Sequence, residues 1–337
     1  MRNSVHSCNA LYCVWLYTAV LLMPTAGMGI ILHPDGEPNL LTWADRPASA
    51  VVGKWSSNAS FVVVSPKWVL TVRHQNTNPA TVNINAVTYN CIYNPLWIGG
   101  PAGNADIRLV RLKNSDGSDP NLVYAPLYTS TNEVNRDICL GGYGKYRGNT
   151  LSLNGKDYGY AWAGTIGILR WGQNKIDAYT DVNSSPYYSE ALRADFDLDG
   201  ETYEAAPALY DSGGGWFINQ GGVWKVAALS SNVQRSGATW FDDPNTTEEI
   251  DADNFYGIRI SSYVAWINEI IAADCPVGDL DDDCDVDAFD LAILAEQWLR
   301  ADCLTVSPIL CDGADFQANG KVNFADFAIF AQNWLIE

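Results

Sequence analysis

Short apolar runs, separated by Gly, Asn, Asp and Pro, fill the chain from about residue 50 to 260. The clearest are SFVVVS (60–65), KWVLTV (67–72), DIRLVRL (106–112), GGGWFI (213–218) and VWKVAALS (223–230). Many short strands with turn residues between them are typical of an all-β sandwich or barrel. The pattern therefore predicts a mainly β body.

The pattern changes to helical spacing at 261–273, the segment SSYVAWINEIIAA. Five apolar side chains fall on one side of a helix there, at Tyr263, Trp266, Ile267, Ile270 and Ile271. Serine is a favoured N-cap residue, so Ser261 or Ser262 is expected to cap this helix. The helix closes the β body.

Beyond the body, two segments repeat at an offset of 36 residues. GDLDDDCDVDAFDLAILAEQWL (278–299) aligns with ADFQANGKVNFADFAIFAQNWL (314–335). Each segment begins with a polar loop and continues with apolar residues at helical spacing, which predicts two loop–helix units. A solvated acidic tail would not carry repeated apolar faces.

The polar residues of each repeat have the spacing of a calcium loop. A hard cation takes six to eight oxygen ligands, and side chains at positions 1, 3, 5, 9 and 12 with the position-7 carbonyl can surround one point. The predicted Ca²⁺ ligands of the first loop are Asp279, Asp281, Asp283, the Asp285 carbonyl, Asp287 and Asp290. Those of the second are Asp315, Gln317, Asn319, the Lys321 carbonyl, Asn323 and Asp326.

Charge and hydropathy exclude several functions. The 337 residues carry a formal net charge of −19, which argues against nucleic-acid binding, since phosphates demand a basic surface. Residues 274–337 alone hold 14 acidic and two basic side chains, which separates this segment from a nearly balanced body. No apolar run after the N-terminus reaches the ~18 residues of a membrane span.

The N-terminus has the pattern of a secretory signal. Arg2 precedes an apolar stretch from Ala10 to Met23, and small residues follow, with cleavage expected after Ala26 or Gly29. We therefore expect an exported protein divided into a signal (1–29), a body (30–273) and an acidic module (274–337). A membrane anchor is disfavoured because the stretch is short and ends at a proline.

Six cysteines remain after signal removal, an even number that favours disulfides in an exported chain. Four of them lie in the acidic module. Their spacing contains no short Cys pair and no histidine is near, so zinc is disfavoured. Cys275–Cys284 and Cys303–Cys311 are the expected local pairs, although four cysteines allow three connectivities.

Three residues of the body could form a nucleophilic site. His74 follows the strand WVLTV, Asp106 opens DIRLVRL, and Ser212 lies in YDSGGG; the other two histidines, His6 and His33, lie in or near the signal. A serine hydroxyl becomes a good nucleophile when an imidazole removes its proton and a carboxylate orients that imidazole.

These motifs resemble trypsin-like serine proteases. WVLTVRH is similar to their histidine strand, NADIRLVRL to their aspartate segment, YDSGGG to their nucleophile loop and SSYVAWINEII to their C-terminal helix. The order His, Asp, Ser is also the trypsin-like order. The resemblance covers about residues 30–273 and implies a double β-barrel fold and peptide-bond hydrolysis.

The resemblance also implies residue roles. His74 would be the general base, Asp106 its orienting carboxylate and Ser212 the nucleophile, while the N–H groups of Ser212 and Tyr210 would form the oxyanion hole. The family usually has glycine where Tyr210 stands, and a bulky side chain restricts how that N–H is aimed. Ala206 would lie at the base of the primary specificity pocket, which favours a neutral or apolar substrate residue there.

In the family, a freed Ile or Val amino terminus pairs with the aspartate before the serine, which here is Asp211. Cleavage after Gly29 would expose Ile30-Ile31, so signal removal itself is the expected activation step. The alternative is an isoleucine that merely follows the signal.

The repeated loop–helix units resemble dockerin modules, because position 12 is Asp and the repeats lie 36 residues apart. The resemblance implies two calcium sites and a cohesin-like scaffold partner. Two departures bear on this: Cys284 replaces a glycine in the first loop, and apolar pairs (Ala288-Phe289, Phe324-Ala325) replace the usual Ser-Thr recognition pair.

The sequence thus indicates a secreted serine endopeptidase tethered by a calcium-binding module, with no cofactor needed for catalysis. The alternative is a catalytically impaired, protease-like binding or scaffold component of an extracellular assembly. That the assembly would degrade polysaccharide is implied only by the resemblance to dockerin modules.

Overall fold

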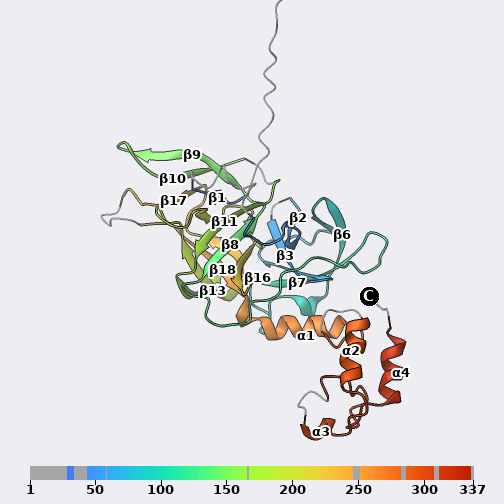
Figure 1. Ribbon diagram of the computed structural model, residues 1–337. Coiled ribbons are helices and arrows are strands. Elements are labelled where there is room, and N and C mark those ends of the chain that lie inside the picture. The colour runs from blue at the N-terminus through green and yellow to red at the C-terminus, as the bar shows by residue number, and fades with distance from the viewer. Residues whose placement is uncertain are drawn as a thin grey trace, which may run out of the picture.

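The β body and the acidic module form separate parts of the structure (Figure 1). The computed structural model describes residues 29–33, 44–57, 59–164, 167–245, 251–281, 286–306 and 311–334. The expected signal up to residue 28, and the expected ligands Asp283 and Asp285 with Cys284, lie outside the described residues.

A closed six-stranded barrel forms the first half of the body. Its antiparallel order is β2-β3-β4-β7-β6-β5, and the pair Lys54–Asn83 between β2 and β5 closes it. Every residue of β3 and β4 is buried, which explains why these strands are continuous apolar runs rather than alternating ones. The strands are β2 (Val52–Trp55), β3 (Ala59–Ser65), β4 (Trp68–Thr71), β5 (Thr81–Ile84), β6 (Val87–Ile92) and β7 (Arg108–Lys113).

A seven-stranded antiparallel sheet forms the second half, in the order β11-β8-β15-β16-β18-β13-β12. The expected second barrel is therefore not closed by its strand ladder. The strands are β8 (Asp137–Gly142), β11 (Arg170–Lys175), β12 (Ala178–Ser184), β13 (Tyr187–Asp195), β15 (Gly215–Gln220), β16 (Val223–Val233) and β18 (Asn254–Arg259).

The free edge of β11 explains why the ladder stays open. The Gln173 N–H donates to the carbonyl of Tyr203 (2.7 Å), so an irregular segment takes the place that a strand would fill. The Asn174 side chain then reaches the Asp195 carbonyl on β13 (2.7 Å). The sheet is curled until its two sides meet, but side-chain and loop bonds join them.

Two smaller sheets complete the body. A hairpin of β9 (Tyr146–Leu153) and β10 (Lys156–Ala163) is joined by β17 (Ala238–Trp240). Near the expected mature N-terminus, β1 (Ile31–Leu32) pairs with β14 (Ala205–Ala206), with Ile31 opposite Ala206. The second and third residues after Gly29 are thus part of a sheet. Short 3₁₀ turns lie at Ser49–Val51 and Pro95–Trp97.

The C-terminal helix of the body, α1 (Val264–Asp274), begins three residues later than expected. A 3₁₀ turn, η4 (Ile260–Ser262), precedes it, and its N-cap is Tyr263, without a capping side-chain bond. The two candidate cap serines are engaged elsewhere, Ser261 with Glu133 (2.6 Å) and Ser262 with Glu190. The prediction that Ser261 or Ser262 caps this helix was therefore wrong.

The seam between the two halves is apolar. Val62 and Leu70 of the barrel, Phe217 and Leu229 of the sheet, and Trp266 of α1 belong to one buried cluster. At this seam, the end of the barrel where β4 ends and β7 begins lies against the turn that leads into β15.

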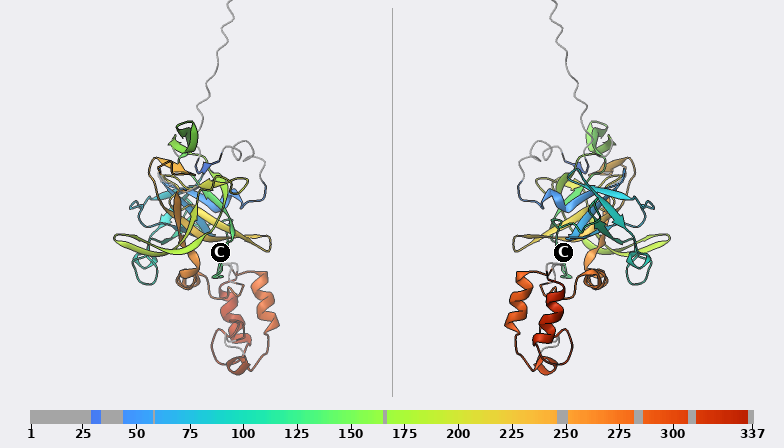
Figure 2. Two further views of the ribbon diagram at one scale, coloured as in Figure 1. Left: turned by 90° about the vertical axis from the view of Figure 1, so that its left-hand side faces the viewer. Right: turned by 90° about the vertical axis from the view of Figure 1, so that its right-hand side faces the viewer.

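The acidic module has its own small core. Its helices are α2 (Ala288–Glu296), α3 (Cys303–Val306) and α4 (Phe324–Gln332). They enclose Val286, Leu294, Val322 and Phe330, and the module extends away from the sheets beyond α1 (Figure 2). The Cys303–Cys311 disulfide is present, which confirms that predicted pair.

Cys275 is also disulfide-bonded. Its predicted partner, Cys284, is not among the described residues. None of the helices in the described ranges has the length and apolar character that a membrane crossing requires.

Candidate functional site

His74, Asp106 and Ser212 meet at the seam between barrel and sheet. His74 Nδ1 lies 2.6 Å from Asp106 Oδ2, and His74 Nε2 lies 3.0 Å from Ser212 Oγ. His74 follows β4 and Asp106 precedes β7, so neighbouring barrel strands bring them together; Ser212 comes from the turn before β15. The imidazole thus connects a carboxylate to a hydroxyl, each within hydrogen-bonding distance.

The Asp106 carboxylate is almost completely buried and fully hydrogen-bonded. Besides the imidazole, it accepts bonds from the backbone N–H groups of Arg73 (2.9 Å) and His74 (2.7 Å) and from Ser231 Oγ (3.1 Å). Four donors satisfy a buried anion and fix its orientation. The imidazole, with its side chain 30% exposed, is open to a substrate.

The side chain of Arg73, the residue before the histidine, does not enter the site. Its side chain donates to the Gly103 carbonyl (2.6 Å) and lies 5.3 Å from the centre of the Tyr187 ring. Only its backbone N–H takes part, through Asp106.

The turn that carries Ser212 depends on glycine. Gly213 has φ of +82°, and a Cβ there would lie 2.2 Å from the Ser60 carbonyl oxygen and 2.4 Å from Thr71 Oγ1. Both are fully buried barrel residues that cannot withdraw. The Ser60 N–H also donates to the Ser212 carbonyl (2.8 Å), so the nucleophile turn is held directly against β3.

The two expected oxyanion donors differ in backbone strain. Neither the Tyr210 nor the Ser212 N–H donates to an acceptor within the part of the chain that the structure describes, so both are free to bind an oxyanion. Tyr210 has φ of +80°, a left-handed conformation that costs a non-glycine residue about 1–3 kcal/mol. The tyrosine therefore adopts the conformation for which glycine is normally used.

Three site residues are missing from the sequence prediction. Ser231 bonds Asp106, Ser189 Oγ accepts from the Asp106 N–H (2.7 Å), and Gln75 Nε2 lies 3.3 Å from His74 Nε2. Only Ser231 had a readable signal, because Ser230-Ser231 interrupts an otherwise apolar strand. Ser189 reaches the site through the fold of the β12–β13 hairpin.

Asp211 has no solvent exposure and joins three segments. Its carboxylate accepts N–H bonds from Ile30 (3.2 Å), Gly144 (2.7 Å) and Ala208 (2.9 Å). Burial raises the pKa of Asp211 to about 7, while these N–H bonds and the nearby Arg170 oppose that rise. Ile30, also fully buried, has φ of +64°, which is unfavourable for a β-branched residue.

Ala206 is 1% exposed and pairs with Ile31, yet it lines a small pocket next to the nucleophile turn. The other walls come from residues 233–235, 238–239 and 253–255.

The first loop of the acidic module gathers three carboxylates. Oxygens of Asp279, Asp281 and Asp290 lie within 4.8 Å of one another, a cluster that fits a hard cation. The buried Asp290 also accepts from the N–H groups of Leu280 (2.5 Å) and Asp287 (2.7 Å). Asp287 caps α2 through the Phe289 N–H (2.7 Å).

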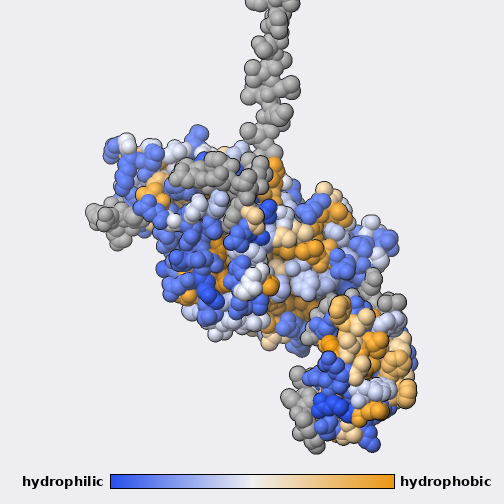
Figure 3. All heavy atoms as spheres, viewed as in Figure 1, coloured by the Kyte–Doolittle hydropathy of each residue, from blue (hydrophilic) through white to orange (hydrophobic). Residues whose placement is uncertain are grey.

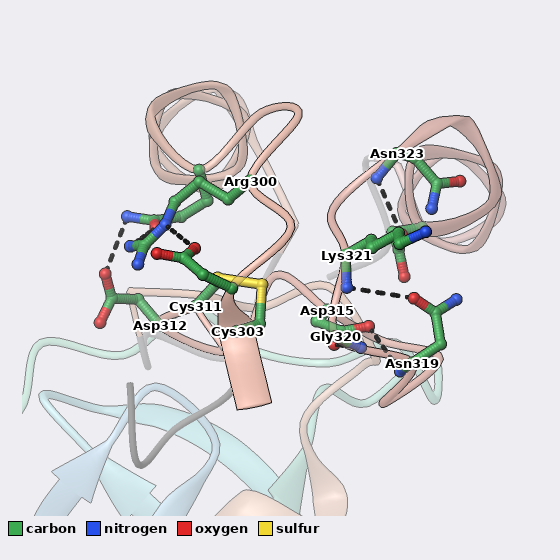
Figure 4. Close-up of a disulfide and its surroundings, with 12 residues drawn as sticks. Arg300, Cys303, Cys311, Asp312, Asp315, Asn319, Gly320, Lys321 and Asn323 are labelled. Carbon is green, nitrogen blue, oxygen red and sulfur yellow. Dashed lines mark hydrogen bonds and ion pairs between the residues drawn. A yellow bond between two sulfur atoms is a disulfide. The ribbon is translucent and has the colours of Figure 1, made fainter. Parts of the chain in front are cut away.

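The second loop has fewer charged side chains, and Figure 4 shows part of it, with Asp315, Asn319, Lys321 and Asn323. Asp315 accepts from the N–H groups of Asn319 (3.1 Å) and Gly320 (2.7 Å), and the Lys321 N–H donates to Asn319 Oδ1 (3.1 Å). Asn323 and Asp326 form a capping box on α4, as Asp287 and Asp290 do on α2. Gln317 Oε1 accepts from the Asn319 amide (2.9 Å).

Comparison with known proteins gives distant likenesses. No protein-family model matches the sequence. The inactive form of the Rv3671c protease matches at 14% identity, covering 65% of this chain and 89% of that chain, with a TM-score of 0.38. An inactive serine-to-alanine mutant of Rv3671c from M. tuberculosis H37Rv matches at 16% identity, covering 68% and 90%, with a TM-score of 0.38. Neuropsin, a serine protease expressed in the limbic system of mouse brain, matches at 16% identity, covering 66% and 95%, with a TM-score of 0.41.

All three are proteases, but the likenesses are too distant to assign residues. The chemistry of this site therefore rests on its own distances.

The buried Asp211 predicts a pH-dependent stability in the chain that retains Gly29. The folded state keeps this carboxyl protonated up to about pH 7, whereas an unfolded aspartate ionises near 3.8. The folded chain then binds more protons between these values, so its free energy of unfolding falls as the pH rises through this window. Asp211→Asn should remove on the order of 4 kcal/mol of that fall.

Urea unfolding of wild type and Asp211→Asn between pH 4 and 8 measures how the free energy of unfolding of each depends on pH. Glu204 and Asp195, whose pKa values burial raises to about 9 and about 6, contribute to both curves and cancel. The exposed Asp137→Asn is the control. Parallel curves for wild type and Asp211→Asn would contradict the prediction.

Proposed function

We propose that this chain is a secreted serine endopeptidase that hydrolyses peptide bonds with Ser212 as nucleophile. The observation that carries the proposal is the continuous series Asp106–His74–Ser212, with contacts of 2.6 and 3.0 Å. The distant likeness to proteases agrees with it but adds no residue roles.

In this mechanism, His74 Nε2 takes the Ser212 proton as Oγ attacks the substrate carbonyl carbon. His74 Nδ1–H remains bonded to Asp106, which stabilises the imidazolium and keeps Nε2 directed at the hydroxyl. The N–H groups of Tyr210 and Ser212 receive the developing oxyanion. The imidazolium then protonates the leaving amine, and a water molecule completes hydrolysis by the same steps in reverse roles.

The second candidate is a protease-like binding or scaffold component with impaired catalysis. The strained conformation of Tyr210 favours it, because a tyrosine at φ of +80° could relax and turn its N–H away from the oxyanion position. Reactivity of Ser212 separates the two candidates.

A fluorophosphonate probe tests that reactivity. Wild type should be labelled at Ser212, because the probe requires an activated serine, whereas Ser212→Ala should lose labelling completely. His74→Ala should slow labelling by orders of magnitude, roughly as loss of any triad member does. Ser118→Ala, an exposed loop serine, is the matched control. Equal labelling of wild type and Ser212→Ala, or none in the wild type, would contradict the proposal.

We further propose that removal of the signal after Gly29 activates the enzyme. The Ile30 backbone N–H already donates to the buried Asp211 carboxylate. Cleavage would convert this N–H into an ammonium, whose positive charge would stabilise the ionised form of Asp211, and would also release the constraint that holds Ile30 at φ of +64°. Asp211 lies between Tyr210 and Ser212, so its position affects both oxyanion donors.

N-terminal sequencing of the secreted protein should therefore find Ile30 first. A form beginning at Ile30 should hydrolyse peptides faster than one retaining Gly29, on the order of 100-fold if an oxyanion donor depends on the ion pair. Asp211→Asn should abolish the difference between the two forms. A secreted chain that starts well beyond Ile31 would rule this activation out.

For the acidic module we propose two calcium sites and a tethering role in a dockerin-like manner. The three converging carboxylates of the first loop support the ion site. Exposed aromatic residues support a protein partner: Phe289 is 69% and Phe324 77% exposed, and Figure 3 shows apolar residues on the surface of the module. A cohesin-like scaffold protein at a cell surface or in the medium is the partner that this arrangement would suit.

Calorimetric titration of the full chain with calcium should show two binding events. The tighter event should belong to the first loop, which has more carboxylates, and Asp290→Ala should abolish it. A free calcium concentration of 100 times the dissociation constant of a site should raise the free energy of unfolding of the module by about 2.7 kcal/mol. Asp302→Ala, an acidic residue outside both loops, is the control. A titration without heat or stabilisation would overturn the calcium proposal.

A further inference from the structure

The small pocket lined by Ala206 is placed to receive a substrate side chain. One wall is Ala206-Pro207, in the segment that leads into the Ser212 turn. Another begins at Val233, two residues after Ser231, whose hydroxyl bonds Asp106. Both walls run directly from residues of the site, so the side chain next to an attacked carbonyl would enter between them.

This pocket has almost no free space. Its volume is about 10 Å³, roughly what a single water molecule needs. A phenyl ring, a long aliphatic chain or a guanidinium cannot enter without moving a wall. The wall residues include Val233 and Phe255, whose backbones belong to the ladder between β16 and β18, and the longest and most flexible side chain among them is Arg235.

The Arg235 guanidinium is fixed from three sides. Its Nε donates to Asp253 Oδ1 (2.7 Å) and its Nη2 to Asp243 Oδ2 (2.6 Å), and its central carbon lies 3.5 Å from the centre of a ring of Trp240. Only 28% of its side chain is exposed. Two charge-assisted bonds and an aromatic face make this a rigid position for arginine.

Asp253 gives the pocket a buried negative charge that depends on Arg235. Asp253 is 4% exposed, and its second carboxylate oxygen accepts the Trp240 N–H (2.9 Å). Burial raises the pKa of Asp253, and the adjacent Arg235 opposes that rise. Displacing Arg235 would leave a buried carboxylate without its cation, which is strongly unfavourable.

We propose that Arg235 is a built-in plug of the primary specificity pocket, so that the enzyme cleaves after small uncharged residues such as Gly, Ala and Ser. This inference rests on the proposed peptidase function of Ser212. The plug excludes aromatic and long aliphatic side chains by volume. It excludes lysine and arginine because they would have to displace the cation already bound to Asp253.

The same arrangement determines what removal of the plug would do. Arg235→Ala would free the volume of a long side chain and leave Asp253 Oδ1 without its cation, while Oδ2 keeps the Trp240 N–H. A substrate arginine could then place its own guanidinium where that of Arg235 lies. The variant should therefore gain cleavage after Arg and Lys, a change of charge preference that mere loosening of a pocket would not produce.

Peptides that differ only in the residue before the cleaved bond, Ala, Phe or Arg, test the plug on the full-length active form. Wild type should prefer Ala over Phe and Arg, each by on the order of 100-fold in kcat/KM. Arg235→Ala should raise kcat/KM for the Arg peptide by on the order of 10- to 100-fold and change that for Ala little. The double variant Arg235→Ala/Asp253→Asn should lose the gain.

Controls separate folding, function and specificity. Arg300→Ala removes a comparable aspartate-bonded arginine in the acidic module and should leave the profile unchanged. Arg235→Gln, which keeps polar contacts without charge, is measured in parallel in case the alanine variant does not fold. Fluorophosphonate labelling of Ser212 reports an intact site in each variant.

The outcomes are distinct. Absence of labelling and cleavage in the wild type would overturn the proposed function and this inference with it. A labelled wild type that cleaves after Phe or Arg as readily as after Ala would overturn the plug alone. So would labelled Arg235 variants with unchanged profiles.

Discussion

The carboxyl group of Asp211, fully enclosed by protein, joins three segments of the chain: Ile30 just before β1, Gly144 two residues after β8, and Ala208 in the turn before Ser212. Each contributes one backbone N–H, so this carboxyl group stabilises the main chain itself rather than a set of side chains. The nucleophile turn has no regular secondary structure, and it is held by this buried acceptor, by the barrel contact at Ser60 and by backbone bonds between Gly213, Gly214 and Ser230.

Much of the body could be predicted from sequence because it depends on local patterns. Runs such as SFVVVS are strands buried on both faces, and their continuous apolar character is the reason. The motifs around His74, Asp106 and Ser212 lie at strand ends and in a turn, where the fold converges. In the acidic module, the internal repeat predicted two loop–helix units, and their capping boxes use the same positions expected to bind a cation.

What the sequence could not provide depends on tertiary contacts. Nothing near Ser189 indicates that its hairpin reaches the Asp106 N–H. The serines before α1 have good capping propensity, but Glu133 and Glu190 compete for their hydroxyls and the helix begins later. The second half was expected to close as a barrel, yet loop and side-chain bonds at β11 replace the last strand pair. Arg235 belongs to none of the sequence motifs around His74, Asp106 and Ser212, and only the fold brings it to the pocket.

The site has no structural element of its own, because its barrel residues and its sheet residues belong to two bodies that touch along an apolar seam. Hydrophobic contact is non-directional, so the directional bond from the Ser60 N–H to the Ser212 carbonyl matters for how the two halves are aligned. A slide of about 1 Å between them would leave every strand intact and still cost a reaction about 100-fold. Phe217 of the sheet and Val62 of the barrel lie in the same buried cluster at this seam, so packing of the core holds the reacting groups in place. The geometry of the reacting groups is therefore determined by core packing between the two halves, far from the surface where the substrate binds.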